Sequence, residues 1–135
     1  MADANKNKEK IDYWLTTARY DLVSAQAMLK TKRFLYVGFL CHQVVEKCLK
    51  AYFWYTRKAA PPYTHNLFVL SEKSKFDYSG GERYFQLFKD LMPLNIQARY
   101  PEDKDLLLKS LNQLKCAEFY KQTKGFYLWI RKLLL

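Results

Sequence analysis

Four polar side chains interrupt an otherwise apolar stretch of the sequence: Gln43, Glu46, Lys47 and Lys50. At 3.6 residues per helical turn, this spacing places all four on one stripe. If the stripe lines a cleft, its two ammonium groups would face phosphate. If it lies on a solvated face, Glu46 and Lys50 form an i, i+4 pair worth only about 0.2–0.5 kcal/mol. Composition favours the solvated face and leaves the phosphate site as the alternative.

Two further clusters contain residue types suited to anions or bases. The segment 61–67, Pro-Pro-Tyr-Thr-His-Asn-Leu, carries His65, which either orders a loop at a helix start or takes part in a site. Pro101 restricts the backbone next to Arg99 and Tyr100. An arginine fork suits phosphate or carboxylate, and a tyrosine ring stacks on a base. The sequence agrees equally well with a structural role, in which Arg99 donates hydrogen bonds to the carbonyls at a helix C-terminus.

The motifs of the familiar enzyme classes are absent. The sequence has no Gly-x-Gly-x-x-Gly, P-loop, Gly-x-Ser-x-Gly or His-Glu-x-x-His motif, and no cysteine pair at zinc spacing. With two histidines, a histidine-built metal centre would need unusual help from carboxylates. We therefore expect neither a metal nor a cofactor.

Charge and composition limit the partners and the location. The 135 residues include 23 Lys and Arg against 13 Asp and Glu, a formal charge of +10. This excess favours nucleic acid, nucleotide phosphates or an acidic protein as partner, although a solvated lysine face explains it too. The polar N-terminus lacks a signal-peptide core, and no apolar run approaches the ~18 residues of a membrane span. We expect a cytoplasmic protein that does not enter the membrane.

The three cysteines, Cys41, Cys48 and Cys116, cannot all pair with one another. Cys41 and Cys48 are seven positions apart, which on a helix separates their Cα atoms by ~10 Å, beyond disulfide reach. We expect all three to be small buried hydrophobic residues with reduced thiols, as suits the cytosol.

Apolar residues recur at steps of three and four along the chain, which is typical of amphipathic helices. The first four helices are expected over residues 9–30, 33–56, 67–75 and from about 82. The second is apolar around more than half its circumference, which indicates a central position. The predicted fold is all-α, an antiparallel up-and-down bundle of four main helices plus one short helix. It forms one domain over residues 1–135, with residues 1–8 as a flexible tail.

Local signals indicate where the helices begin and end. Thr64 or Asn66 is expected to cap the third helix. Pro93 is expected to break or kink the fourth and leave a short helical turn after it. Asp105 is predicted to cap a last helix that runs to the C-terminus. Gly125 within that helix either lets another chain approach or marks an interruption.

The clusters form an ordered pattern: Trp14-x-x-x-Ala18-x-x-Asp21-Leu22-x-x-Ala25, His42-Gln43-x-x-Glu46-Lys47-x-x-Lys50-Ala51, Thr64-His65-Asn66-Leu67 and Arg99-Tyr100-Pro101. In its order and spacing this pattern resembles the HEPN family (higher eukaryotes and prokaryotes nucleotide-binding domain). The resemblance implies a helical bundle that is usually a homodimer and binds a nucleotide such as ATP. It also implies pairing with a small nucleotidyltransferase, in some cases as a toxin–antitoxin system.

The same resemblance gives six candidate residues for binding nucleotide or anion: Glu46, Lys47, Lys50, His65, Arg99 and Tyr100. In the implied roles, Lys47, Lys50 and Arg99 face phosphates. Tyr100 contacts a base or sugar, while Glu46 and His65 orient the others. We expect the three cationic side chains to face the same hollow.

One departure from the family concerns catalysis. HEPN ribonucleases carry an Arg followed four to six residues later by a His, whereas Arg99 is followed by Tyr-Pro-Glu-Asp-Lys-Asp-Leu. The acid–base pair expected for RNA cleavage is therefore missing from its usual place, and no catalytic residue is assigned. This favours a binding module. The alternatives are a ribonuclease with a displaced pair such as Arg99 and His65, and an interaction dimer without a small ligand.

Overall fold

The computed structural model of the chain describes residues 2–97 and 109–135, and every regular element in these ranges is helical. The long helices are α1 (Ala2–Lys30), α2 (Phe34–Arg57), α4 (Phe85–Gln97) and α6 (Gln113–Leu134). Between α2 and α4 lie the short helix α3 (Leu67–Lys73) and the 3-10 turns η1 (Phe76–Tyr78) and η2 (Glu82–Tyr84). The predicted all-α fold with four main helices and one short one is confirmed.

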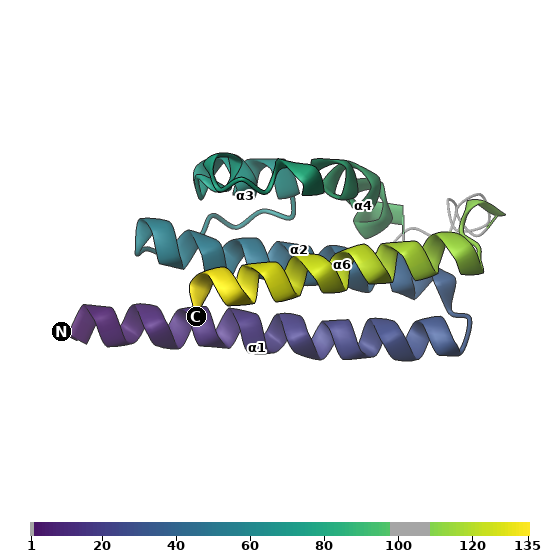
Figure 1. The fold of residues 1–135 in the computed structure, drawn as a ribbon, viewed down its shortest axis with the longest axis horizontal. Helices are drawn as coiled ribbons and strands as arrows, with labels where there is room; N and C mark the ends of the chain where they lie inside the picture. The colour runs from purple at the N-terminus through teal and green to yellow at the C-terminus, as the bar shows by residue number, and fades with distance from the viewer. Residues whose placement is uncertain (1, 98–108) are drawn as a thin grey trace.

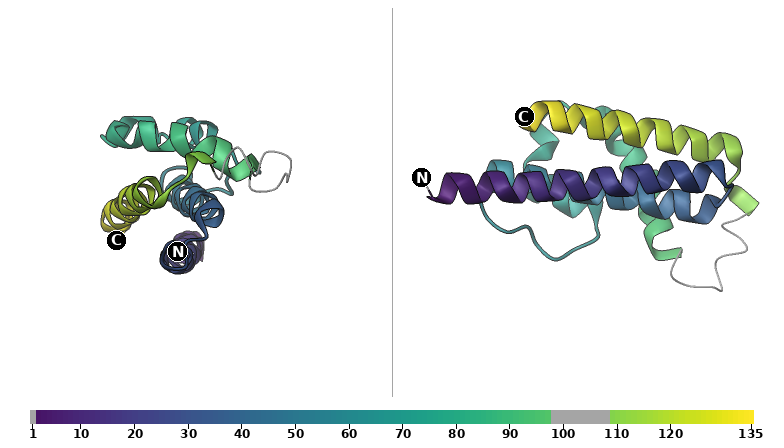
Figure 2. Two further views of the ribbon diagram at one scale, coloured as in Figure 1. Left: turned by 90° about the vertical axis from the view of Figure 1, so that its right-hand side faces the viewer. Right: turned by 90° about the horizontal axis from the view of Figure 1, so that it is seen from below.

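Successive long helices run in opposite directions (Figure 1), as an up-and-down bundle requires. α1 and α2 form a long hairpin, α6 returns alongside both, and α3 and α4 cover the remaining side of α2 (Figure 2). More than half of the 24 residues of α2 are buried as a result. The central position expected from its apolar circumference is confirmed.

An aromatic cluster fixes the segment from α3 to α4 against the hairpin. Phe76 in η1 is fully buried and lies 5.5 Å from the ring of Tyr52 in α2 and 5.7 Å from that of Phe126 in α6. Both contacts are edge-to-face, the arrangement that aromatic rings prefer. One ring thus joins three parts of the bundle.

Two element boundaries differ from those expected. Residues 2–8, expected as a tail, form the first turns of α1, and Ala4 and Asn7 line a hollow beside Trp54 and Leu134. α6 begins at Gln113, because Asn112 is extended and its Oδ1 accepts a hydrogen bond from the amide of Lys115 at 2.9 Å. The expected cap, Asp105, lies outside the described residues.

Of the two outcomes expected at Pro93, the break is wrong, since α4 continues through it to Gln97, and the kink stays a prediction. Proline removes one helical hydrogen bond and crowds the carbonyl four residues earlier, which is that of Lys89. Pro93 lies on the exposed side of α4, so water can satisfy this carbonyl. The helix is therefore retained.

The cysteine prediction is confirmed, because all three thiols are buried and unbridged. The cap prediction is confirmed for Asn66, whose side chain accepts from the amides of Phe68 and Val69 at the start of α3. Of the helices in the described ranges, none has both the length and the apolar character to cross a bilayer.

Gly125 lies within α6 without interrupting it, and a Cβ atom at this position would meet no atom within 4 Å. Replacing Gly125 with Ala is therefore expected to raise the free energy of unfolding by about 1 kcal/mol, because alanine loses less backbone entropy in a helix. Urea denaturation followed by circular dichroism measures this. A destabilisation that grows with protein concentration would instead show that another chain packs against this glycine.

Candidate functional site

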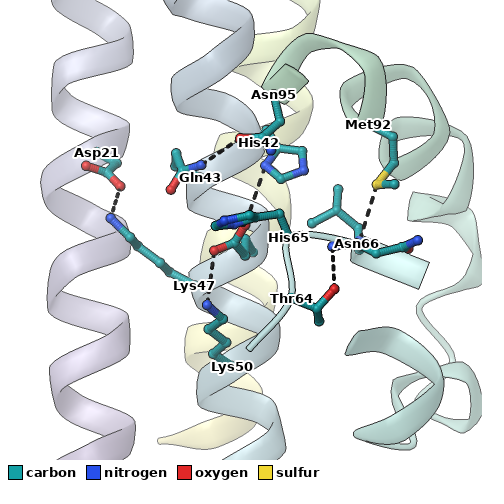
Figure 3. Close-up of polar contacts among 12 residues, drawn as sticks. Asp21, His42, Gln43, Lys47, Lys50, Thr64, His65, Asn66, Met92 and Asn95 are labelled. Atoms are coloured by element: carbon teal, nitrogen blue, oxygen red, sulfur yellow. Dashed lines mark hydrogen bonds and ion pairs between the residues drawn. The ribbon is translucent and has the colours of Figure 1, made fainter. Parts of the chain in front are cut away.

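The loop that carries His65 is held at both ends. Lys58 ends α2 in the left-handed conformation, and Arg57 Nε donates a hydrogen bond to the carbonyl of Lys73 in α3 at 2.8 Å. At the other end the Asn66 side chain caps α3, and the backbone amide of Asn66 donates a hydrogen bond to Thr64 Oγ1 at 3.1 Å. The loop consequently runs alongside α2 on the side away from α6 (Figure 2). This path brings His65 against the polar residues of α2 (Figure 3).

Glu46 forms the centre of the site, and its side chain is only 4% exposed. Its Oε1 pairs with His65 Nδ1 at 2.9 Å, and its Oε2 accepts a hydrogen bond from Lys50 Nζ at 3.1 Å. His42 Nδ1 lies 3.8 Å from Oε1, one helical turn earlier. A buried carboxylate is stable only with such partners, because burial removes its hydration. We call Glu46, Lys50, His65 and His42 the Glu46 cluster.

Lys50 connects the Glu46 cluster to α1. It is 8% exposed, and its Nζ lies 5.1 Å from the centre of the Trp14 ring. An ammonium group over an indole face is attracted by the negative charge of that face. Lys50 therefore has an anionic partner on its own helix and an aromatic partner on α1.

The other two residues of the polar stripe point toward different helices (Figure 3). Lys47 forms an ion pair with Asp21 of α1, while Gln43 Nε2 donates to Asn95 Oδ1 of α4 at 3.0 Å. The stripe thus contacts α1, α4 and the loop rather than solvent. The expectation of a solvated face is wrong, because four helices and a loop surround α2.

The structure brings Glu46, Lys50 and His65 together and directs Lys47 toward α1. Lys47 and Lys50, the two lysines of α2 expected to face phosphate, are each paired with a carboxylate of the chain itself. Arg99 and Tyr100 lie outside the described residues, so their roles stay predictions. In the described ranges, no three His, Cys, Asp or Glu side chains are grouped to hold a metal ion.

Two partners in the site were part of the sequence pattern but had no role assigned: Trp14 and Asp21. The antiparallel pairing of the first two helices could have indicated both contacts. In an antiparallel hairpin, residue numbers rise along one helix as they fall along the other. Trp14 therefore faces a later residue of α2, Lys50, and Asp21 faces an earlier one, Lys47.

Comparison with known families decides the classification. A family model described as "HEPN domain" matches residues 11–133. This chain belongs to the HEPN family. Three pairs of residues in its HEPN pattern are mutual partners: Trp14 with Lys50, Asp21 with Lys47, and Glu46 with His65. In this HEPN domain, much of the pattern therefore holds α1, α2 and the loop together.

The same fold is found in a solved structure, the crystal structure of the protein TT1696 from Thermus thermophilus. The two share 21% sequence identity with a TM-score of 0.77, over 91% of this chain and 97% of the other. At this identity the likeness concerns the fold alone. A search of curated proteins found no match.

Proposed function

We propose that this chain is a non-catalytic HEPN module that binds a nucleotide and acts as a homodimer with a nucleotidyltransferase partner. The observation that carries nucleotide binding is an excess of positive charge at one end of the bundle. Lys6, Lys8 and Lys10 are exposed on the first turns of α1, and Lys58 ends α2. Within the described ranges, only Lys47 and Lys50 among the lysines have an ion pair.

These four lysines attract anions because their fields add over a small surface. Lys6 and Lys58 border the same hollow, and Lys8 and Lys58 border the next together with Asp12. The net charge of +10 strengthens the same attraction. Homodimer formation and the nucleotidyltransferase partner, including a toxin–antitoxin pairing, rest on the family resemblance. The missing Arg–His spacing supports binding without cleavage.

Isothermal titration calorimetry with ATP, GTP and a short RNA tests the proposal. We expect saturable heat with at least one nucleotide, at a Kd on the order of micromolar. The affinity should fall as salt is added, because screening weakens contacts between exposed charges. The proposal fails if no ligand gives saturable heat and no complex forms with a co-encoded nucleotidyltransferase.

One observation favours a ribonuclease as the second candidate. The His65 side chain is 40% exposed while its Nδ1 is bonded to a buried carboxylate, the arrangement in which a general base is oriented toward substrate. Incubation with total RNA separates the two functions. Cleavage that is lost in both His65→Ala and Arg99→Ala would replace the binding proposal with a ribonuclease.

A further inference from the structure

A pocket of about 310 Å³ opens beside Lys50, between α1, α2 and the loop that follows α2. Its walls are formed largely by aromatic rings and prolines: Tyr13, Trp14, Trp54, Pro61, Pro62 and Tyr63. The charged residues in its lining are Lys10 and Lys50, and no carboxylate lines it. The pocket therefore combines flat apolar surface with positive charge.

The lysines of the pocket differ in how far their charge is compensated. Lys50 is buried and paired with Glu46, whereas Lys10 is exposed and has no ion pair in the described part of the chain. Glu46 neutralises about one of the two charges, so an excess positive charge remains at the mouth, next to Lys10. An anionic group of the ligand would lie there.

The pocket walls are fixed before any ligand binds. Trp54 is 8% exposed, and Trp14 is held beside Lys50. Pro61 and Pro62 restrict the backbone of the loop, and the Asn66 cap fixes its far end. Two tyrosines of the lining are exposed: Tyr13 to 60%, and Tyr63 to 95% with a single edge-on approach to the His65 ring at 5.9 Å. Buried walls with two accessible tyrosine rings suit a planar ligand, because little ordering is needed on binding.

Size and chemistry together restrict the ligand. A volume of 310 Å³ lies at the lower end of the range for small-molecule sites, about 300–1,000 Å³. Aromatic side chains stack on any of the nucleobases, and lysine side chains bind phosphate groups. We propose that this pocket binds one nucleotide, with its base on the rings of Trp14, Trp54 and Tyr63 and its phosphate at Lys10. This inference rests on the proposed function and places the nucleotide away from Lys47.

Tryptophan fluorescence gives a readout from the pocket itself. Trp14 and Trp54 line the pocket, whereas Trp129 packs against Phe76 and Tyr84. In a Trp129→Phe variant, the tryptophan emission therefore comes from Trp14, which borders this pocket and neither hollow beside Lys58, and from Trp54, which borders all three. Titration with AMP is expected to quench it in a saturable way, with the Kd that calorimetry gives for the wild type. Adenosine and ribose 5-phosphate, which each lack one half of the ligand, are expected to bind at least tenfold more weakly.

Two exposed positions allow variants that leave the core intact. Lys10→Glu reverses the charge at the mouth, and Tyr63→Ala removes the more exposed of the two accessible rings. Each is expected to raise the Kd for AMP about tenfold, since stacking on one base contributes about 1–3 kcal/mol. Lys121→Glu and Tyr78→Ala are matched controls, because both residues are exposed and neither lines the pocket. The controls are expected to leave the Kd unchanged.

The outcomes separate this inference from the proposed function. Nucleotide binding that persists unchanged in both pocket variants, without quenching, overturns the pocket and leaves the proposed function standing. Equal affinity for ribose 5-phosphate and AMP overturns the role of the aromatic rings. If the wild type binds none of ATP, GTP, AMP and RNA, the proposed nucleotide binding fails and this inference fails with it.

Discussion

Replacing Glu46 with Ala is expected to lower the free energy of unfolding by about 3 kcal/mol. The substitution removes the carboxylate that accepts from Lys50 at 3.1 Å and pairs with His65 at 2.9 Å. Lys50 then keeps a buried positive charge without its partner, which costs desolvation energy that nothing offsets. The Trp14 ring remains 5.1 Å from Lys50 Nζ, which places the loss at the low end of the usual range. Urea denaturation followed by circular dichroism measures it.

Two comparisons show whether burial of the pair causes this loss. The double variant Glu46→Leu with Lys50→Met removes both charges and retains most of the volume, so it should recover most of the stability. Asp21→Asn breaks the more exposed pair with Lys47, whose side chains are 13% and 19% exposed, and should cost only about 1 kcal/mol. Equal losses in Glu46→Ala and Asp21→Asn would contradict a special role for the Glu46 cluster.

The fold was predictable because its strongest signals are local. Steps of three and four among apolar residues depend only on helical geometry, so they indicated α1, α2 and the central place of α2. The ends of the helices depend also on contacts with other parts of the chain and with water. Residues 2–8 are mostly polar, yet they are helical, and Ala4 and Asn7 line a hollow together with Trp54 and Leu134. Pro93 removes one helical hydrogen bond, but its exposed position lets water satisfy the freed carbonyl, and α4 is not broken there.

The site was predictable to the extent that its contacts lie within one helix. Glu46 and Lys50 are four residues apart, so helical geometry alone makes them neighbours. Their burial, and the contact with His65 19 residues later, depend on the path of the loop, which no local pattern gives. The contacts of Lys47 with Asp21 and of Lys50 with Trp14 depend on the register between α1 and α2. The aromatic pocket requires three segments at once, so it emerged only from the structure.

Raising the pH from 7 to 10 is expected to lower the free energy of unfolding by about 3 kcal/mol through two thiols. Cys41 and Cys48 are fully buried. Burial raises the pKa of Cys41 from 9.0 to about 12, and it raises the pKa of Cys48 strongly as well. In the unfolded chain both thiols ionise near pH 9, so above that pH the unfolded state releases protons that the folded state keeps. Above that pH, each thiol then lowers the free energy of unfolding by about 1.4 kcal/mol per pH unit. Below about pH 8 neither thiol affects stability.

The variant Cys41→Ala with Cys48→Ala isolates this contribution. Its stability at pH 7 is expected to be lower, because small cavities replace the sulfur atoms. Its loss between pH 8 and pH 10 should nevertheless be smaller than that of the wild type by about 3 kcal/mol. Urea denaturation across this interval measures both slopes, and equal slopes would assign the alkaline loss to other groups. Because only the thiolate attacks an electrophile, thiols that stay protonated to such high pH serve packing rather than chemistry. The nucleotide binding that we propose is therefore to be tested at the aromatic pocket and the lysines around it rather than at the cysteines.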